Sequence, residues 1–261
     1  MRIGDIELVP LDDGVATIPT SWYANVDWER HADLLADDGR LHIPIGCYLV
    51  RTAGRTVLLD AGMGPVVNDI GRGGDLPAEL ARVGVAPADI DTVVCSHLHL
   101  DHAGWLVDEG EPFFPNATVR YGAGDWQAWV AGAPEHDRIR QGMERLAELG
   151  RLDPMEGDML PLAPGLTGRF TPGHTDGHYA LVLSSGEARA LLLGDAVECP
   201  LQLEEPDLYI LSDMDPGLAR RTREAVWQEI EGTDVLVGAA HFPGLQLGRV
   251  MPGQGKRHFV T

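Results

Sequence analysis

Side chains that bind metal ions are concentrated in one short segment of the chain. Residues 97–102 read HLHLDH and directly follow an apolar run typical of a buried strand. In an extended segment residues i and i+2 face the same way, so His97 and His99 can hold one cation together while Leu98 and Leu100 point into packing. Asp101 and His102 come where the chain must turn, which aims them at a second position. The spacing therefore predicts two metal ions.

A pair of metal ions needs more ligands than one loop supplies. Further His and Asp residues stand at the ends of other apolar runs, often beside Gly or Pro: His174, Asp195, His241 and the early Asp60. A lone residue of this kind is usually a cap or turn residue. Their joint occurrence with the histidine-rich segment favours a shared metal site.

This ordered set resembles the metallo-β-lactamase superfamily, with its HxHxDH signature, a later His, a later Asp and a final His. The resemblance covers nearly the whole chain and is closer to the dinuclear hydrolases than to the true β-lactamases, which usually lack the bridging Asp. It implies that Asp60 and His178 support the ligands without binding metal. The implied ligands are His97, His99 and His174 for the first metal, Asp101, His102 and His241 for the second, and Asp195 bridging both.

The length of 261 residues and the hydrophobic content of 44% allow a large core. We expect one α/β domain over residues 1–261, because no Pro-, Gly- or Ser-rich linker divides the chain. The resemblance implies an αββα sandwich, the metallo-β-lactamase fold, with two mixed β-sheets packed face to face and helices outside. Short echoes between residues 55–97 and 189–241 fit two similar halves, and helices are expected at 77–83, 124–131, 136–149 and 216–231.

The balance of 20 basic and 40 acidic residues gives a net charge of −20, which argues against nucleic acid and anionic membranes as partners. No apolar stretch is long enough to span a membrane, and the first residues lack the pattern of a secretory signal. Three cysteines without paired spacing are expected as buried thiols. These features predict a cytoplasmic protein with a small-molecule substrate, and a homodimer stays open.

Imidazole and carboxylate ligands suit zinc, with manganese, iron or cobalt left open, so we expect two divalent metal ions per chain. A hydroxide bridging two such ions exists at neutral pH and attacks a carbonyl carbon or phosphorus. Asp101 is expected to hold this nucleophile and pass its proton to the leaving group. The chemistry predicted is hydrolysis of an ester-like bond in a small molecule: a lactone, an ester or a phosphotriester.

Within the superfamily the chain most resembles the branch of N-acyl-homoserine lactone lactonases and methyl parathion hydrolase, notably over residues 96–105, 114–117, 194–197 and 241–244. Those lactonases carry a Tyr three residues after the bridging Asp, where this chain has Glu198. A carboxylate cannot donate a hydrogen bond, so this difference disfavours quorum-signal lactones as substrates. The candidate substrate contacts are Trp22, Tyr23, Phe113, Phe114, Trp126 and Glu198.

Three alternatives stay open at this point. A thioester or β-lactam hydrolase would use the same ligands. A mononuclear iron-dependent thiol oxygenase, which the superfamily also contains, would use a single iron on three ligands. A non-catalytic binding protein would keep the metal site for its structure alone.

Overall fold

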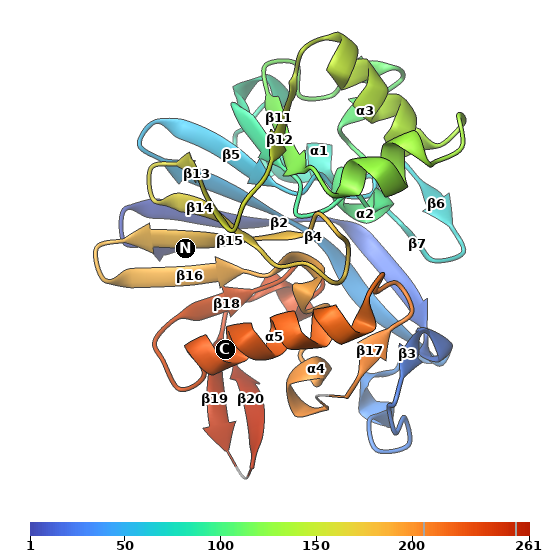
Figure 1. Ribbon diagram of the computed structural model, residues 1–261, viewed down its shortest axis with the longest axis vertical. Helices are drawn as coiled ribbons and strands as arrows, with labels where there is room; N and C mark the ends of the chain where they lie inside the picture. Colours follow the sequence, from blue (N-terminus) through green and yellow to red (C-terminus); the bar gives the residue numbers. More distant parts are fainter. Residues whose placement is uncertain (206, 254) are drawn as a thin grey trace.

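The computed structural model describes residues 1–205, 207–253 and 255–261. Two β-sheets lie against each other in the middle of the molecule, and helices cover the outer face of each sheet (Figure 1). This arrangement is the αββα sandwich with mixed sheets that the resemblance implies.

The first sheet has the strand order β12-β11-β8-β5-β4-β2-β7-β6, with β1 paired to β2. Strands β5, β8, β11 and β12 are consecutive in this order and run parallel to one another. The remaining pairs of the sheet are antiparallel. Its strands are β1 (Arg2–Ile3), β2 (Ile6–Pro19), β4 (Arg40–Thr52), β5 (Arg55–Leu59), β6 (Val67–Asn68), β7 (Gly71–Arg72), β8 (Thr92–Val94), β11 (Thr118–Gly122) and β12 (Leu152–Met155).

The second sheet has the order β13-β14-β15-β16-β18. Only its last pair, β16 with β18, is parallel. Its strands are β13 (Met159–Ala163), β14 (Leu166–Phe170), β15 (Tyr179–Ser185), β16 (Ala188–Leu192) and β18 (Leu236–Gly238). Three two-stranded ribbons complete the β structure: β3 (Tyr23–Ala24) with β17 (Tyr209–Ile210), β9 (Val107–Asp108) with β10 (Glu111–Pro112), and β19 (Arg249–Gly253) with β20 (Lys256–Val260).

Alternation of side chains along the strands builds the layers. Val57 and Leu59 of β5 point between the sheets, where they join Leu181 and Leu192 of the second sheet in one buried cluster. Leu58, between them, points the other way and packs under the helices. Each central strand is therefore apolar on both faces, which explains its nearly continuous run of Val and Leu.

Helices α1 (Leu76–Arg82) and α3 (Arg138–Glu148) cover the first sheet, and α5 (Pro216–Ile230) covers the second (Figure 1). Both longer helices begin at an N-cap aspartate: Asp137 accepts a hydrogen bond from Arg140 N at 2.9 Å, and Asp215 accepts one from Leu218 N at 2.8 Å. The shorter helices are α2 (Leu100–Ala103) and α4 (Leu201–Glu204).

Three of the four expected helices form within two residues of their expected ends. The fourth, expected at 124–131, is shorter and is a five-residue π-helix, Gln127–Ala131. Asp101 and His102 lie in the short helix α2, where the sequence alone predicts only a turn. The two-halves expectation is confirmed, because β5 pairs with β8 and β16 pairs with β18 in the same parallel sense.

The three cysteines are buried and unpaired. Among the described residues, no helix has both the length and the apolar composition needed to cross a lipid bilayer.

Candidate metal centre

The predicted ligands follow strands that end at one edge of the sandwich. His97 and its neighbours come after β8, Asp195 after β16 and His241 after β18. These three strands belong to the parallel parts of the two sheets, so their carboxyl ends meet where the sheets adjoin. His174 comes from the loop between β14 and β15. The structure brings all seven predicted side chains together at this edge.

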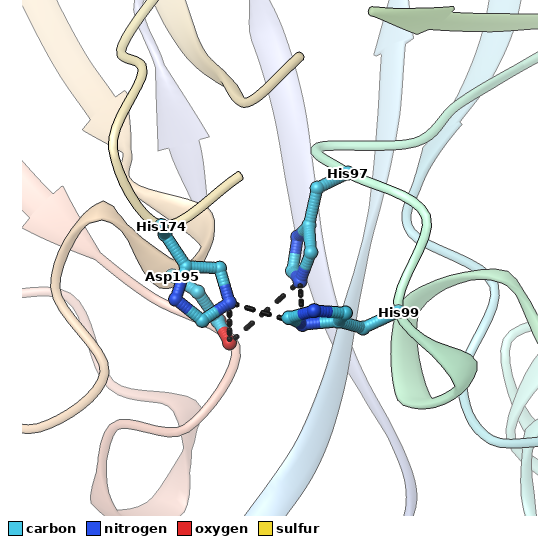
Figure 2. Close-up of side chains that lie close together, drawn as sticks. All are labelled: His97, His99, His174 and Asp195. Atoms are coloured by element: carbon cyan, nitrogen blue, oxygen red, sulfur yellow. Dashed lines mark hydrogen bonds and ion pairs between the residues drawn. The ribbon is translucent and has the colours of Figure 1, made fainter. Parts of the chain in front are cut away.

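The first group joins three imidazoles and a carboxylate, which point toward one another (Figure 2). His99 Nδ1 lies 2.8 Å from His97 Nε2 and 3.0 Å from His174 Nε2. Asp195 Oδ2 closes the group at 3.5 Å from His174 Nε2. All four ligand atoms lie within 4.8 Å of one another.

The second group consists of Asp101, His102 and His241. Asp101 Oδ2 lies 3.5 Å from His241 Nε2 and 3.7 Å from His102 Nε2. Asp195 reaches this group too, because its Oδ1 lies 3.4 Å from both imidazole nitrogens. One oxygen of Asp195 therefore faces each group.

The converging nitrogen and oxygen atoms are arranged to bind a cation rather than to hydrogen-bond with one another. Within the described part of the chain, His102 Nε2 and Asp195 Oδ1 are buried and have no hydrogen-bond partner. A neutral imidazole that donates through Nδ1 carries a bare lone pair on Nε2, and lone pairs that face one another repel. A divalent cation among these nitrogen and oxygen atoms removes that repulsion and satisfies each of them.

In three of the rings a hydrogen bond at the opposite nitrogen holds the imidazole in place. His102 Nδ1 donates to Asp60 at 2.9 Å, His174 Nδ1 donates to Asp213 at 3.0 Å, and His241 Nδ1 donates to the Pro44 carbonyl at 2.7 Å. Each contact assigns the proton to Nδ1 and directs Nε2 to the centre. This pattern is typical of histidines that bind metal ions.

Asp60 organises the histidine-rich segment. Its carboxylate accepts hydrogen bonds from Ser96 N at 2.7 Å and Ser96 Oγ at 2.9 Å, besides the bond from His102. Its own backbone is left-handed, with φ of 61°, which is unfavourable for a residue with a side chain and is retained where the surroundings require it. The position of Asp60 agrees with the supporting role that the resemblance implies.

His178 holds the backbone at Asp195. Its Nε2 accepts a hydrogen bond from Asp195 N at 3.0 Å, so its proton lies on Nδ1 and points to Thr171 Oγ1 at 2.8 Å. Burial lowers the pKa of His178 to about 3, which keeps the ring neutral. Gly194 is required beside it, because a Cβ there would lie 2.7 Å from His178 Nε2 and its φ is 53°.

Charges in the centre change the pKa values of its members. Burial alone would lower the pKa of His241, but the carboxylates of Asp195 and Asp101 outweigh it and raise that pKa to about 9. Burial, reinforced by the negative charge of Asp195, raises the pKa of Glu198 to about 7. The carboxylates therefore favour positive charge at His241, where the sequence predicts a metal ion.

A cavity of about 230 Å³ opens onto the centre. Trp22 and Glu198, both predicted to contact substrate, line it together with Asp101 and His241. The apolar part of the wall comes mainly from side chains of β2 and β4 that sequence reasoning did not single out: Ala16, Ile18, Ile43 and Ile45.

The other aromatic candidates have different surroundings. Phe113, Phe114 and Trp126 pack in the core beneath the first sheet, and none of them is among the described residues that line the cavity. Tyr23 is buried and is not among the described residues that line the cavity, and its burial together with the charge of Glu198 raises its pKa. Leu100, expected in packing, lines the cavity. A turn of helix α2 places it there, because helical residues do not alternate faces as strand residues do.

Two aspartates that the sequence analysis missed support the ligands from a distance. Asp213 is fully buried and accepts the hydrogen bond from His174 Nδ1. Asp125 joins the loops of the first group, since it accepts from Leu98 N at 3.0 Å and from Gly177 N at 2.7 Å. Each lies three residues past the end of a strand, Asp125 after β11 and Asp213 after β17, so the strand-end pattern that found the ligands could have found both.

The model of the metallo-β-lactamase superfamily matches residues 44–241, which include all seven converging side chains. The chain belongs to this superfamily, whose members include metal-dependent hydrolases.

Curated relatives point to one branch of the superfamily. The N-acyl homoserine lactonase of Bacillus thuringiensis is 30% identical over 215 residues, covering 72% of this chain and 79% of the relative. The N-acyl homoserine lactonase AiiB of Agrobacterium fabrum is 29% identical over 188 residues, covering 59% of this chain and 62% of that protein.

Solved structures share the fold. The dizinc quorum-quenching lactonase AidC superposes with a TM-score of 0.86 at 23% identity, covering 100% of this chain and 95% of AidC. The hydrolase AbOPH has the same TM-score at 22% identity, with the same coverage of both chains.

Proposed function

We propose that this protein hydrolyses a lactone or a related ester of a small molecule, with two divalent metal ions held by the seven converging side chains. The observation that carries the proposal is the position of Asp195, whose two oxygens each face a separate group of ligand atoms. A carboxylate shared in this way is what a pair of adjacent metal ions requires. The curated relatives, named as lactonases, support the substrate class.

Zinc is the proposed metal at both positions. The first group offers three imidazole nitrogens and one carboxylate oxygen, a set that suits tetrahedral zinc. The second offers two imidazoles and a carboxylate in addition to the shared oxygen of Asp195. Manganese, iron and cobalt are the alternatives that metal analysis would distinguish.

When bound, the two cations supply Lewis acidity for the scissile carbonyl and lower the pKa of a water molecule toward neutrality. Asp101 is the more exposed of the two carboxylates of the centre that line the cavity, with 29% of its side chain exposed against 4% for Asp195. We assign it to accept a hydrogen bond from the attacking water and to pass the proton to the leaving alcohol. The apolar wall formed by β2 and β4 holds the hydrocarbon part of the substrate and excludes water.

The assembled second group favours a hydrolase over the iron-dependent thiol oxygenase. One iron on three ligands would leave Asp101, His102 and His241 without a role, yet the two imidazoles are buried and oriented by Asp60 and Pro44. A thioester or β-lactam hydrolase uses the same centre, and substrate comparison separates these classes.

The test combines metal analysis with a substrate panel. We expect about two metal ions per chain and metal-dependent turnover of lactones ahead of aryl esters, thioesters, β-lactams and phosphotriesters. Asp195→Ala should lower lactone kcat/KM by more than about 100-fold, because both groups lose a shared ligand. Asp37→Ala, at an exposed carboxylate, is the matched control. Full activity of metal-free protein, or of Asp195→Ala, would refute the proposal.

A further inference from the structure

His99 is oriented differently from the other histidines of the metal centre. Its Nδ1 faces the first group, 2.8 Å from His97 Nε2 and 3.0 Å from His174 Nε2 (Figure 2). The other rings face the centre through Nε2 and make a hydrogen bond at Nδ1; that of His97 donates to Ser96 Oγ at 3.0 Å. Within the described residues, both hydrogen-bonding contacts of the His99 side chain are at Nδ1. No protein partner at Nε2 therefore holds this ring.

An aromatic side chain packs against His99 instead. The indole of Trp129 meets the imidazole edge to face, with ring centroids 4.5 Å apart and an interplanar angle of 88°. This is a favoured arrangement of two aromatic rings, and it restricts the tilt of each ring relative to the other. Packing by Trp129 therefore restricts the ring of His99 where hydrogen bonds restrict the other rings.

The backbone around Trp129 has an unusual form. Trp129 lies in the π-helix Gln127–Ala131, and Gly132 N donates a hydrogen bond to the Gln127 carbonyl at 2.9 Å. Turns of this kind are rare and are frequent at functional sites. Glycine suits position 132, because a Cβ there would lie 2.8 Å from the same carbonyl oxygen. The π-helix sets the indole against a predicted metal ligand.

Stability alone does not explain an indole at this position. Trp129 packs against the apolar cluster beneath the first sheet, yet its Nε1 is buried and has no hydrogen-bond partner in the described part of the chain. A buried N–H without a partner destabilises the folded protein, and a phenylalanine would avoid this loss. The contact with His99 gives the larger ring of tryptophan a role.

We propose that Trp129 is a positioning residue for the first metal ion, because its indole holds the His99 ring with Nδ1 directed at that ion. This inference rests on the proposed pair of metal ions and does not depend on the substrate. His99 belongs to the first group alone. Loss of the indole should therefore weaken the binding of one metal ion and leave the other unchanged, whereas a general loss of packing would weaken both.

The test measures both zinc dissociation constants by competition with a chromophoric chelator. Trp129→Leu and Trp129→Met remove the ring but keep an apolar side chain. Each should raise one constant at least about fivefold and leave the other within about twofold of the wild type. Trp129→Phe keeps a smaller ring and should restore most of the lost affinity. Denaturant unfolding of the metal-free proteins shows which variants fold.

Trp126→Leu is the matched control. Trp126 packs against the same apolar cluster, but its aromatic neighbour is Tyr121, with ring centroids 5.9 Å apart, and not a metal ligand. Both zinc constants should stay within about twofold of the wild type in this variant, even where its stability falls.

A double-mutant cycle separates positioning from a structural role. His99→Ala should weaken the same metal ion, and in that background Trp129→Leu should change neither constant by more than about twofold, because the ring it positions is gone. A further loss in that background would overturn the inference. So would unchanged constants, or equal weakening of both ions, in the single variants that lack the ring.

The proposed function is tested separately in the same titration. A wild type that binds two zinc ions, with constants that the loss of the Trp129 ring leaves unchanged, would overturn the inference alone. A wild type that binds fewer than two would refute the proposed pair of metal ions, and the inference with it.

Discussion

Three imidazoles of the metal centre depend on a partner at the far nitrogen. The partners differ in kind: Asp60 for His102, the Pro44 carbonyl for His241, and Asp213 for His174. A carboxylate partner raises the basicity of the ring and fixes its tautomer, so these partners influence metal affinity without touching the metal.

Asp213 offers the sharpest test of this influence. It is buried with Arg223, whose Nη1 lies 3.6 Å from Asp213 Oδ2. Asp213→Ala should weaken metal binding about 10- to 100-fold, because His174 loses the partner that orients it. Competition with a chromophoric chelator measures the dissociation constant. Asp37→Ala should bind metal like the wild type, and an unchanged constant in Asp213→Ala would contradict the assigned role.

His241 links metal binding to pH. In the metal-free protein its pKa is raised to about 9, so the ring is protonated at pH 7, whereas a metal ion binds only the neutral ring. Metal binding at pH 7 should therefore release at least one proton, and affinity should increase as pH rises toward 9. Calorimetry in buffers of different ionisation enthalpy measures the proton count. No proton release at pH 7 would contradict this expectation.

At the scale of elements, the ends of strands and the loops after them determine the site. The loops after β5 and β8 are joined to each other by Asp60, and the loop after β16 is joined to the loop after β14 by His178. Asp13 of β2 joins another set of segments: its carboxylate accepts from Met63 N at 2.7 Å, Leu76 N at 2.8 Å and Trp105 Nε1 at 2.8 Å.

Asp13→Ala should lower the free energy of unfolding by about 3–5 kcal/mol, because several buried donors lose one shared acceptor. Asp12→Ala is the neighbouring control. Asp12 is exposed and accepts from Gly14 N at 3.0 Å, so its loss should cost about 1 kcal/mol or less. Denaturant unfolding measures both, and equal losses would show that Asp13 does not join these segments.

At the scale of the whole molecule, the metal centre connects the two sheets. The first sheet carries the segment 97–102, while the second carries Asp195 and His241. Metal ions held between them should stabilise the folded state as a whole. One domain and a cytoplasmic location remain predictions from the sequence, which leaves open whether the protein forms a homodimer.

Removing the metal ions should lower the melting temperature. At free zinc about 100 times the dissociation constant, one site contributes about 2.7 kcal/mol, a shift of roughly 5–10 °C for a chain of this size. Scanning calorimetry with and without chelator measures the shift, and one transition is expected if residues 1–261 form one domain. Asp195→Ala should show a much smaller shift. An equal shift in that variant would place the stabilising metal elsewhere.

The order and kind of the seven converging side chains could be predicted from the sequence alone. Each follows an apolar strand or a Thr-Pro-Gly turn, so its position depends on local structure that the sequence shows directly. The alternation of strands and helices is local in the same way. These patterns predicted the alternation of strands and helices and the residues of the metal centre, whereas the αββα sandwich and the assignment of each ligand to a metal were implied by the resemblance to the superfamily.

The tertiary structure decided which other residues meet the centre. Asp213 meets His174, and Ser212 lines the same cavity as Glu198, because segments far apart in the sequence fold back together, and the sequence does not show which partner each residue meets. Tertiary packing also buries Phe113 and Phe114 in the core, and side chains of β2 and β4 form the cavity wall instead. Contacts between distant segments depend on how the two sheets pack, and packing is a property of the whole chain.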